Sequence, residues 1–415
     1  MMTALIAPTG EPTERRKFQL TNLDGNNNKF YLVETWNLPN SQVFFRATFG
    51  RVGSNPQIDE KVTNERWVER KIAEKQKKGY VEVALHRPAV QVPSTATNVI
   101  QRDRKVMEII DYIFHEAGEG IASYLAVGVD ALSEEQIEHG RKLLALAQVQ
   151  FATWENAQTA AHGVLLAGTV QHFYNAIPTK LPSRIDRDHV VLNFCKNFDE
   201  HENRLNQLEA AIATLSVQTN NPDLSHYDTL GADLALLPSG DQAYADICDY
   251  IARTAVHGYK IKVREIFTLY NHDERRRFKN NTIGTSNVMQ LFHGTAGQNV
   301  RHIVRSGLIC PRTPSNGRMF GHGIYFANKC TKSANYCSVR KRGRPHFLFL
   351  ADVAVGNQYI AKDAMSDLRT APKGHDSVWG KAGETLAWGG SLAYDEFIVY
   401  NNAQQTLRYV VLFDK

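Results

Sequence analysis

The spacing of apolar residues changes twice along the 415-residue chain, and this change constrains the fold more than any other feature. Up to about residue 85 the apolar residues come in short runs typical of β-strands. From about 98 to 255 they recur every three or four residues, which indicates amphipathic helices. After residue 259 strand-like runs return. The chain is therefore expected to fold as several domains rather than around one core.

The first part is expected to be a small β-rich domain. Its predicted elements are three strands and one helix that stops at Gly79: FQLTNL (18–23), FYLVETW (30–36), VFFRATFGRVG (43–53) and ERWVERKIAEKQKKGY (65–80). The next stretch, 86–97, contains two prolines and small polar residues, which are typical of a linker.

The middle part is expected to be an all-α helical bundle. Ser133 precedes Gln136 by three residues, which is the spacing of a helix capping box. Apolar stripes at helical spacing follow, and one of them is formed by Leu205, Leu208, Ile212 and Leu215. Several such helices in succession predict an antiparallel bundle. No catalytic cluster stands out among them, so a scaffold or regulatory role is expected.

The last part is expected to mix strands with helices and loops. Five runs are typical of strands: YKIKVREIF (259–267), NVMQLF (287–292), PHFLFLADVAVG (345–356), DEFIVY (395–400) and LRYVVLF (407–413). This part spans about 160 residues, which is a common size for one domain.

Charge is distributed unevenly among these parts. Residues 1–97 carry 14 basic and 10 acidic side chains, residues 98–255 carry 11 and 22, and residues 256–415 carry 23 and 11. An acidic middle between two basic ends indicates either electrostatic contact between domains or different partners for each part. Ordinary solvation of the surfaces accounts for the same pattern equally well.

The five cysteines and the apolar runs limit the class of protein. The cysteines are few, odd in number and never in a C-x-x-C pair, which indicates an intracellular, reduced protein without a disulfide framework. The chain has no apolar run of about 18 residues, so no membrane span is expected. The N-terminus lacks the pattern of a secretion signal, and 1–14 reads as a flexible lead-in.

The stretch GHGIYFANKCTKSANYCS (321–338) raises two possible kinds of site. Cys330 and Cys337 are too far apart for the usual spacing of structural zinc ligands, so buried free thiols are favoured and no metal is expected. The glycines precede a short strand-like run rather than a helix and lack the full pattern of a dinucleotide or phosphate loop. Neither a zinc site nor a phosphate loop is therefore favoured.

The same stretch belongs to a wider pattern in the last domain. The segments HGT (293–295), GIYFA (323–327), KSANYC (332–337) and DEFIVYNNAQ (395–404) occur in this order and resemble the catalytic domain of the poly(ADP-ribose) polymerases, with its His-Tyr-Glu signature. The helical part resembles the regulatory helical domain of that family. The first part resembles a WGR domain, although Phe49 stands in FGRVG where the signature tryptophan is expected.

The resemblance implies a multidomain α+β protein. Its expected parts are a WGR domain (15–85), the linker (86–97), an all-α regulatory domain (98–255) and a mixed α/β ADP-ribosyltransferase domain (256–415) with a split, mainly antiparallel sheet. The implied reaction cleaves the nicotinamide–ribose bond of NAD+, the substrate, and passes ADP-ribose to an acceptor.

The resemblance also implies roles for individual residues. The expected catalytic set is His293, Tyr325 and Glu396, and Glu396 with Met319 would lie at the acceptor site. The expected NAD-binding residues are His293, Gly294, Thr295, Asn299, Gly307, Arg312, Tyr325, Lys332, Ser333 and Tyr336. A backbone donor and acceptor at Gly294 with the hydroxyl of Ser333 would suit a carboxamide, and Tyr336 would stack on the nicotinamide ring.

The sequence departs from the family pattern in places that bear on the substrate. The family often has an arginine where this chain has Ile309, and Arg312 is the expected substitute. Arg318 stands where an aromatic residue is common, while Met319 and Glu396 are typical of members that elongate chains. Transfer of single ADP-ribose units stays open as an alternative, because a shorter loop near the acceptor site would restrict elongation.

The resemblance to a WGR domain implies binding of DNA strand breaks. Arg46 and Arg51 would supply positive charge to phosphates, and Phe49 could stack on an exposed base or sugar. Protein acceptors, including the enzyme itself, and a nuclear or, in a bacterium, a nucleoid or cytoplasmic location follow as expectations. A DNA-binding scaffold with a silent transferase fold is the third alternative.

Overall fold

The computed structural model describes residues 12–52, 54–83, 103–220, 225–281, 287–311, 318–387 and 389–415. The chain forms two compact units, one made of Met1–Ala89 with Ala122–Leu215 and the other of Val90–Ile121 with Ser216–Lys415. The mixed, multidomain α+β class that the sequence predicts is confirmed.

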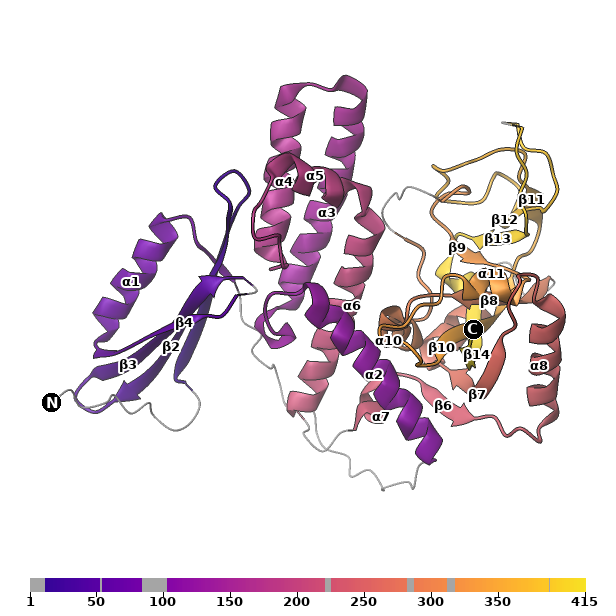
Figure 1. Ribbon diagram of the computed structural model, residues 1–415, viewed down its shortest axis with the longest axis horizontal. Coiled ribbons are helices and arrows are strands. Elements are labelled where there is room, and N and C mark those ends of the chain that lie inside the picture. Colours follow the sequence, from indigo (N-terminus) through magenta and orange to yellow (C-terminus); the bar gives the residue numbers. More distant parts are fainter. Residues whose placement is uncertain are drawn as a thin grey trace. The chain divides into compact units, whose positions relative to one another are not determined.

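An antiparallel sheet and one helix form the first part of unit 1 (Figure 1). The sheet has the order β4-β3-β2-β1-β5, from β1 (Glu14–Asn22), β2 (Asn27–Leu38), β3 (Gln42–Arg51), β4 (Gln57–Thr63) and β5 (Val81–Val83). Helix α1 (Glu65–Lys77) begins where the Asn64 side chain accepts the Trp67 N–H. Its buried Val68 and Ile72 pack against the sheet, so the predicted strands and helix are confirmed.

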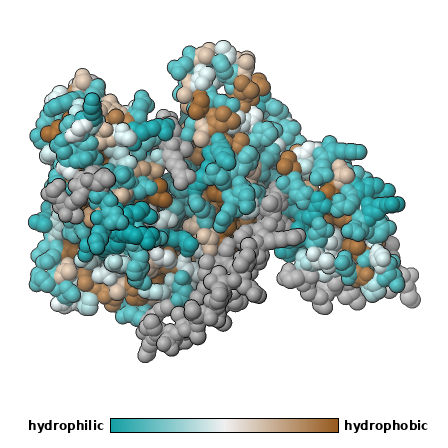
Figure 2. All heavy atoms as spheres, turned by 180° about the vertical axis from the view of Figure 1, so that it is seen from behind, coloured by the Kyte–Doolittle hydropathy of each residue, from teal (hydrophilic) through white to brown (hydrophobic). Residues whose placement is uncertain are grey.

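Helices make up the rest of unit 1: α3 (Glu134–Ala157), α4 (Ala160–Ala176), α5 (Arg187–Lys196) and most of α6 (Phe198–Asn220), after a short 3-10 turn, η1 (Val129–Ala131). The predicted capping box of Ser133 and Gln136 is present at the start of α3. Hydrogen bonds tie the sheet to these helices, for example from Asn28 Nδ2 to the carbonyl of Thr179 at 3.0 Å. The end of the α3–α4 hairpin exposes apolar side chains (Figure 2), among them Val149 and Val164.

Two sheets organise unit 2. The larger has the order β6-β7-β14-β10-β8 and consists of β6 (Asp233–Leu236), β7 (Lys262–Tyr270), β14 (Gln405–Asp414), β10 (His346–Ala354) and β8 (Val288–Gly294). The smaller has the order β11-β12-β13-β9 and consists of β11 (Gln358–Ile360), β12 (Ser377–Gly380), β13 (Glu396–Val399) and β9 (Ile324–Phe326). All pairs are antiparallel except β11 with β12. A bridge between Phe292 and Ala327 links the two sheets.

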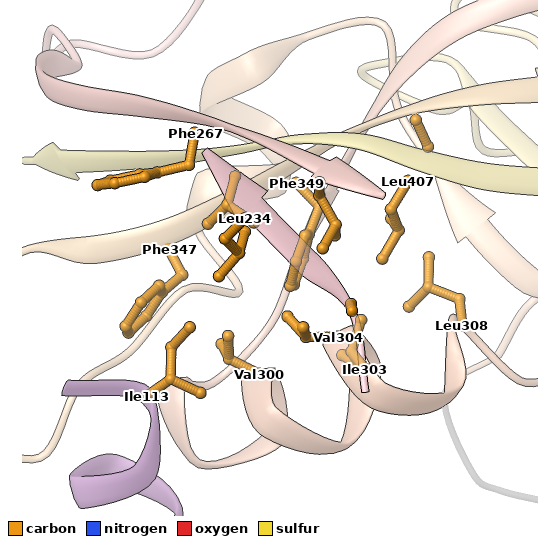
Figure 3. Packing of buried hydrophobic residues seen from close by; sticks show 14 of the residues in the cluster. Ile113, Leu234, Phe267, Val300, Ile303, Val304, Leu308, Phe347, Phe349 and Leu407 are labelled. Atoms are coloured by element: carbon orange, nitrogen blue, oxygen red, sulfur yellow. The ribbon is translucent and has the colours of Figure 1, made fainter. Parts of the chain in front are cut away.

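The helices of unit 2 surround these sheets. They are most of α2 (Arg104–Tyr124), α7 (His226–Thr229), α8 (Gln242–Thr254), α9 (His272–Lys279), α10 (Gly297–Ser306), α11 (Cys330–Ala334) and a 3-10 turn, η2 (Asn402–Gln404). Ile113 of α2 lies in the main core with Val300 and Val304 of α10 and with Phe347 and Phe349 of β10 (Figure 3).

Two features of unit 2 correct the description of 98–255 as purely helical. Residues 233–236 form β6, a strand that pairs with β7 at the edge of the larger sheet. Helix α2 belongs to this unit up to Ile121, while α3, α4 and α5 belong to unit 1. Both differences arise from long-range packing, which the spacing of apolar residues does not specify.

Candidate active site

The proposed catalytic residues come from three strands that meet where the two sheets of unit 2 join. His293 lies near the end of β8, Tyr325 in β9 and Glu396 at the start of β13. The β9–β13 pairing sets Phe397 opposite Phe326, and the Phe292–Ala327 bridge holds β8 beside β9. The fold therefore brings together three strands that are distant in sequence.

His293 is held as a neutral imidazole. Burial lowers its pKa, although the hydrogen bond with the backbone of Tyr325 acts in the opposite direction. The Nδ1 atom lies 2.9 Å from the carbonyl oxygen of Tyr325, which accepts only, so Nδ1 carries the proton and donates it. The other ring nitrogen, Nε2, is then a hydrogen-bond acceptor.

Gly294 is required by the close approach of helix α11. A Cβ at this position would lie 1.8 Å from the carbonyl oxygen of Ser333, which no side chain tolerates. The hydroxyl of Ser333 donates to the carbonyl of Phe292 at 3.1 Å. The end of β8 and the helix with Ser333 therefore form one tightly packed corner.

The two tyrosines have different surroundings. The Tyr325 hydroxyl accepts the Phe320 N–H at 3.0 Å and donates to the Gly321 carbonyl at 2.9 Å, so it fixes the loop before β9. Tyr336 is 66% exposed, and burial together with the charge of Glu396 raises its pKa. Helix α11 contains Ser333 and ends at Ala334, so Tyr336 lies just after the helix.

Glu396 forms an ion pair with Lys332. The ammonium of Lys332 lies 2.5 Å from Oε1 of Glu396 and 3.3 Å from the backbone carbonyl of Asp395. The side chains of Lys332 and Glu396 are 15% and 19% exposed. The pair is therefore shielded from solvent more than a surface pair, although part of each side chain stays exposed.

Three of the predicted NAD-binding residues, Thr295, Asn299 and Gly307, lie in or beside α10. Asn299 donates to the Thr295 hydroxyl at 3.0 Å, which joins the loop before the helix to its first turn. Gly307 ends the helix with φ of 76°, and a Cβ there would lie 2.6 Å from Oε1 of Glu274, so backbone and packing both require glycine. Arg312 lies outside the described residues.

Met319 packs against the smaller sheet. It lies against the core of Phe320, Val378 and Ile398, and its carbonyl accepts the Met365 N–H at 2.7 Å. It also directly precedes the loop that the Tyr325 hydroxyl fixes. The predicted acceptor-site residue is thus held in place by the same smaller sheet that carries Glu396.

The three residues predicted to contact DNA all have partners inside unit 1. Arg46 donates to Glu60 at 2.7 Å. Arg51 donates to the Asn26 carbonyl at 3.0 Å and to the Pro182 carbonyl at 2.9 Å. The Phe49 ring lies 5.6 Å from that of Tyr31. Each guanidinium has five N–H donors, so a phosphate would meet the donors that these contacts do not use.

Sequence reasoning missed two acidic residues in unit 2. Asp395 precedes Glu396 and accepts hydrogen bonds from Trp379, Ala382 and Asn328. Glu116 of α2 is 1% exposed and accepts the Arg340 N–H at 3.2 Å. The adjacent acids of the DE pair (395–396) were a signal for Asp395, whereas nothing local in α2 marks Glu116.

The cysteines and the other acidic side chains offer no metal site in the described ranges. No group of three or more His, Cys, Asp or Glu side chains there could hold an ion. Cys330 and Cys337 are buried and free, and burial raises the pKa of the Cys337 thiol to about 12. In the same ranges no helix combines the length and apolar character needed to cross a membrane.

Comparison with known proteins identifies two domains of this chain. Residues 241–415 match the family model of the poly(ADP-ribose) polymerase catalytic domain, and residues 14–86 match that of the WGR domain. Poly(ADP-ribose) polymerase 2-A of Oryza sativa subsp. japonica is 27% identical over an alignment of 464 residues, which covers 94% of this chain and 68% of that protein.

Two further relatives are matched over shorter shares of their length. Poly(ADP-ribose) polymerase 2 of Zea mays is 30% identical over 58% of this chain and 42% of that protein. Poly(ADP-ribose) polymerase 1 of Xenopus laevis is 29% identical over 68% of this chain and 30% of that protein. The chain therefore spans less than half of these two. By its catalytic and WGR domains, the chain belongs to the poly(ADP-ribose) polymerase family of ADP-ribosyltransferases.

Proposed function

We propose that this protein is an NAD+-dependent poly-ADP-ribosyltransferase that DNA strand breaks activate. The observation that carries the proposal is the meeting of His293, Tyr325 and Glu396 at the junction of the two sheets, with Glu396 paired to Lys332. The matched catalytic domain and the names of the curated relatives support it.

The nicotinamide half of NAD+ would bind beside Gly294. The backbone N–H and carbonyl of Gly294 can bond both ends of a carboxamide. The Ser333 hydroxyl already donates to Phe292, so it would either accept from the amide or rotate to donate to it. The exposed ring of Tyr336 would stack on the nicotinamide, which adds about 0.5–1.5 kcal/mol beyond burial. Tyr325 would hold the wall of this pocket.

The rest of NAD+ would run toward α10. The unprotonated Nε2 of His293 can accept a hydrogen bond from a ribose hydroxyl. Thr295 and Asn299 are joined at the start of α10 and would meet the adenosine half, together with Gly307 and Arg312. These side chains match a ribose in their hydrogen-bonding groups, because a hydroxyl, an amide and a neutral imidazole can all bond its hydroxyls.

In the proposed reaction the glycosidic C–N bond breaks and nicotinamide leaves neutral with the bonding electron pair. Positive charge develops on the ribose, as in glycoside hydrolysis, and the Glu396 carboxylate would stabilise it through the ribose 2′-hydroxyl. An acceptor oxygen then forms the new C–O bond and gives up its proton, for which Glu396 would act as general base. Such a base contributes about 10²–10⁴-fold to the rate.

Chain elongation is favoured over single transfer by Met319 and Glu396. Met319 would line the acceptor site, where the acceptors would be protein side chains, including the enzyme's own, and the ends of growing chains. Mono-ADP-ribosylation is the first alternative. The second alternative is a DNA-binding scaffold whose transferase fold is catalytically silent.

The WGR domain would supply the DNA dependence and direct the enzyme to damaged DNA in the nucleus or nucleoid. Its basic residues, among them Arg46 and Arg51, would meet phosphates, and Phe49 would meet an exposed base or sugar. The acidic helical region would restrain NAD+ use until DNA is bound, which connects the opposite charges of the parts to regulation.

Labelled NAD+ tests these proposals together. The full chain, with and without DNA ends, should give long ladders of labelled protein on a gel only when DNA is present. Single shifted bands would favour mono-ADP-ribosylation. An absence of label with DNA, from a folded protein that still binds the DNA, would favour the scaffold.

A further inference from the structure

Asp395 stands directly before Glu396, and three donors bind its side chain. Oδ1 accepts from the Trp379 indole N–H at 3.1 Å and from the Ala382 backbone N–H at 2.9 Å. Oδ2 accepts from the Asn328 amide at 2.9 Å. Both carboxylate oxygens are therefore engaged by neutral donors, and Asp395 shares none of these side-chain donors with Glu396, whose partner is Lys332.

The three donors come from segments that build the site. Trp379 lies in β12 next to Gly380, the residue that pairs with Glu396. Asn328 follows β9 and stands two residues before α11, which carries Lys332 and Ser333. Asp395 therefore ties the start of β13 to β12 and to the segment that leads into α11.

Strand pairing holds the backbone of Glu396 on one side only. Glu396 is the first residue of β13 and pairs with Gly380 of β12, whereas the pairing with β9 runs from Phe397 to Val399. The Trp379 ring also stacks on the Phe397 ring, with 5.9 Å between the ring centres. Because this packing fixes the Trp379 ring, its indole N–H keeps its direction toward Asp395. The Asp395 contacts thus supply the support that the sheet lacks at this end of β13.

Asp395 is suited to this role as an anion. Burial by itself would raise its pKa, but the hydrogen bonds from Ala382, Asn328 and Trp379 outweigh burial and keep the pKa below the ordinary value. Lys332 spans both acids, because its ammonium bonds the Asp395 carbonyl and the Glu396 carboxylate. A shift of Asp395 would therefore move the Glu396 carboxylate and the Lys332 ammonium together.

We propose that Asp395 is a positioning residue that fixes the Glu396 carboxylate for reaction by binding Trp379, Ala382 and Asn328. The inference rests on the proposed function, which assigns Glu396 to the reacting centre. It goes beyond that function because Asp395 would act through its neighbour without touching NAD+ or the acceptor.

The first test is Asp395→Leu in the full chain with DNA ends. Leucine has a similar size but no acceptor, so the bonds from Trp379, Ala382 and Asn328 are all lost. The kcat for NAD+ should fall by about 10- to 100-fold, because a displacement near 1 Å can cost about 100-fold. The KM for NAD+ should stay unchanged. The control is Asp249→Asn, which removes a charge from the exposed surface of α8 and should leave kcat and KM alone.

A second variant, Asp395→Asn, restores the lost contacts. Its amide oxygen can accept from Trp379 and Ala382, and its NH2 can donate to the Asn328 side-chain oxygen, which has no other partner among the described residues, so kcat should stay near that of the wild type. An unchanged kcat in Asp395→Leu, or a loss of kcat and KM together that Asp395→Asn shares, would overturn the proposal. If Asp395→Leu fails to fold, Trp379→Phe removes only the indole donor, and an unchanged kcat in that variant would overturn it too.

Comparison with Glu396→Gln separates this inference from the proposed function. If the wild type and Glu396→Gln consume NAD+ equally, the proposed function is wrong and the positioning role falls with it. If Glu396→Gln is impaired while Asp395→Leu matches the wild type, only the positioning role is wrong.

Discussion

At the residue scale, the proposed chemistry depends most on the ion pair between Lys332 and Glu396. The two side chains are mostly shielded, so their attraction is screened less than that of an exposed pair. The same ammonium also bonds the Asp395 backbone, which leaves Glu396 with a defined position as well as a charge partner. A carboxylate that is anionic and fixed suits a reaction in which positive charge develops beside it.

Lys332→Met should therefore lower NAD+ turnover without unfolding the protein. Loss of a hydrogen bond to a charged group costs about 1.5–3 kcal/mol, which corresponds to about 10- to 150-fold in rate if it acts fully at the transition state. The measurement is the initial rate of nicotinamide release with DNA ends. Lys279→Met, on the exposed side of α9, is the control, and equal rates in the two variants would contradict the role of the ion pair.

At the element scale, α2 supports the helix that follows His293 and Gly294. Oε2 of Glu116 lies so close to the start of α10 that a Cβ at Gly297 would be 2.9 Å from it. Ala296 caps that helix without a side-chain hydrogen bond, so the Glu116 carboxylate supplies the negative charge at its N-terminus. The Arg301 guanidinium also lies 4.3 Å from the centre of the Phe114 ring of α2.

Glu116→Gln should raise the KM for NAD+ and leave kcat nearly unchanged. The charge at a helix N-terminus contributes about 0.3–1 kcal/mol, which is about a two- to five-fold effect on binding by the adjacent residues Thr295 and Asn299. Initial rates across a range of NAD+ concentrations measure it, with Glu119→Gln on the exposed side of α2 as the control. A KM equal to that of the wild type would show that α2 does not support the NAD+ site.

Helix α6 contains a buried histidine that links stability to pH. His201 is 5% exposed, lies 4.2 Å from the Phe194 ring, and burial lowers its pKa to about 3. As pH falls below about 6.5 the unfolded chain gains the proton before the folded one, so the free energy of unfolding decreases. Between pH 7 and pH 5 the loss should reach about 2 kcal/mol, at 1.36 kcal/mol for each pH unit.

Hydrogen exchange of the α6 backbone amides at pH 7 and pH 5, corrected for intrinsic exchange, measures this loss. His201→Gln removes the titrating ring and should flatten the dependence on pH. A wild-type free energy of opening that is equal at the two pH values would show that His201 is not the source.

At the scale of the whole molecule, the sequence predicts the helices and strands better than their grouping into units. The strand runs, the Ser133 capping box and the free cysteines are confirmed. The assignment of α2 to the catalytic unit was not predictable, because an apolar stripe such as Val106, Ile109 and Ile113 does not specify which body it packs against. Strand β6, with four residues, is too short for a clear alternating pattern.

The site shows the same limit. His293, Tyr325 and Glu396 follow from local motifs and a family resemblance, but the support of Glu396 by Asp395, Trp379 and Asn328 depends on strand register. The domain boundaries and the roles of Arg46, Phe49 and Arg51 in DNA binding stay predictions. A deletion of 98–255, meant to release the enzyme from DNA control, would also remove α2 and β6 from the catalytic unit. Point variants therefore test the account more directly.

The most direct test of the central claim is NAD+ turnover by the full-length wild type and Glu396→Gln, each with and without DNA ends. The account predicts turnover in the wild type that DNA ends stimulate. In Glu396→Gln it predicts a loss of at least about 100-fold in the DNA-stimulated rate, which is the lower bound of a general base contribution. Equal consumption of NAD+ by the two proteins would contradict it.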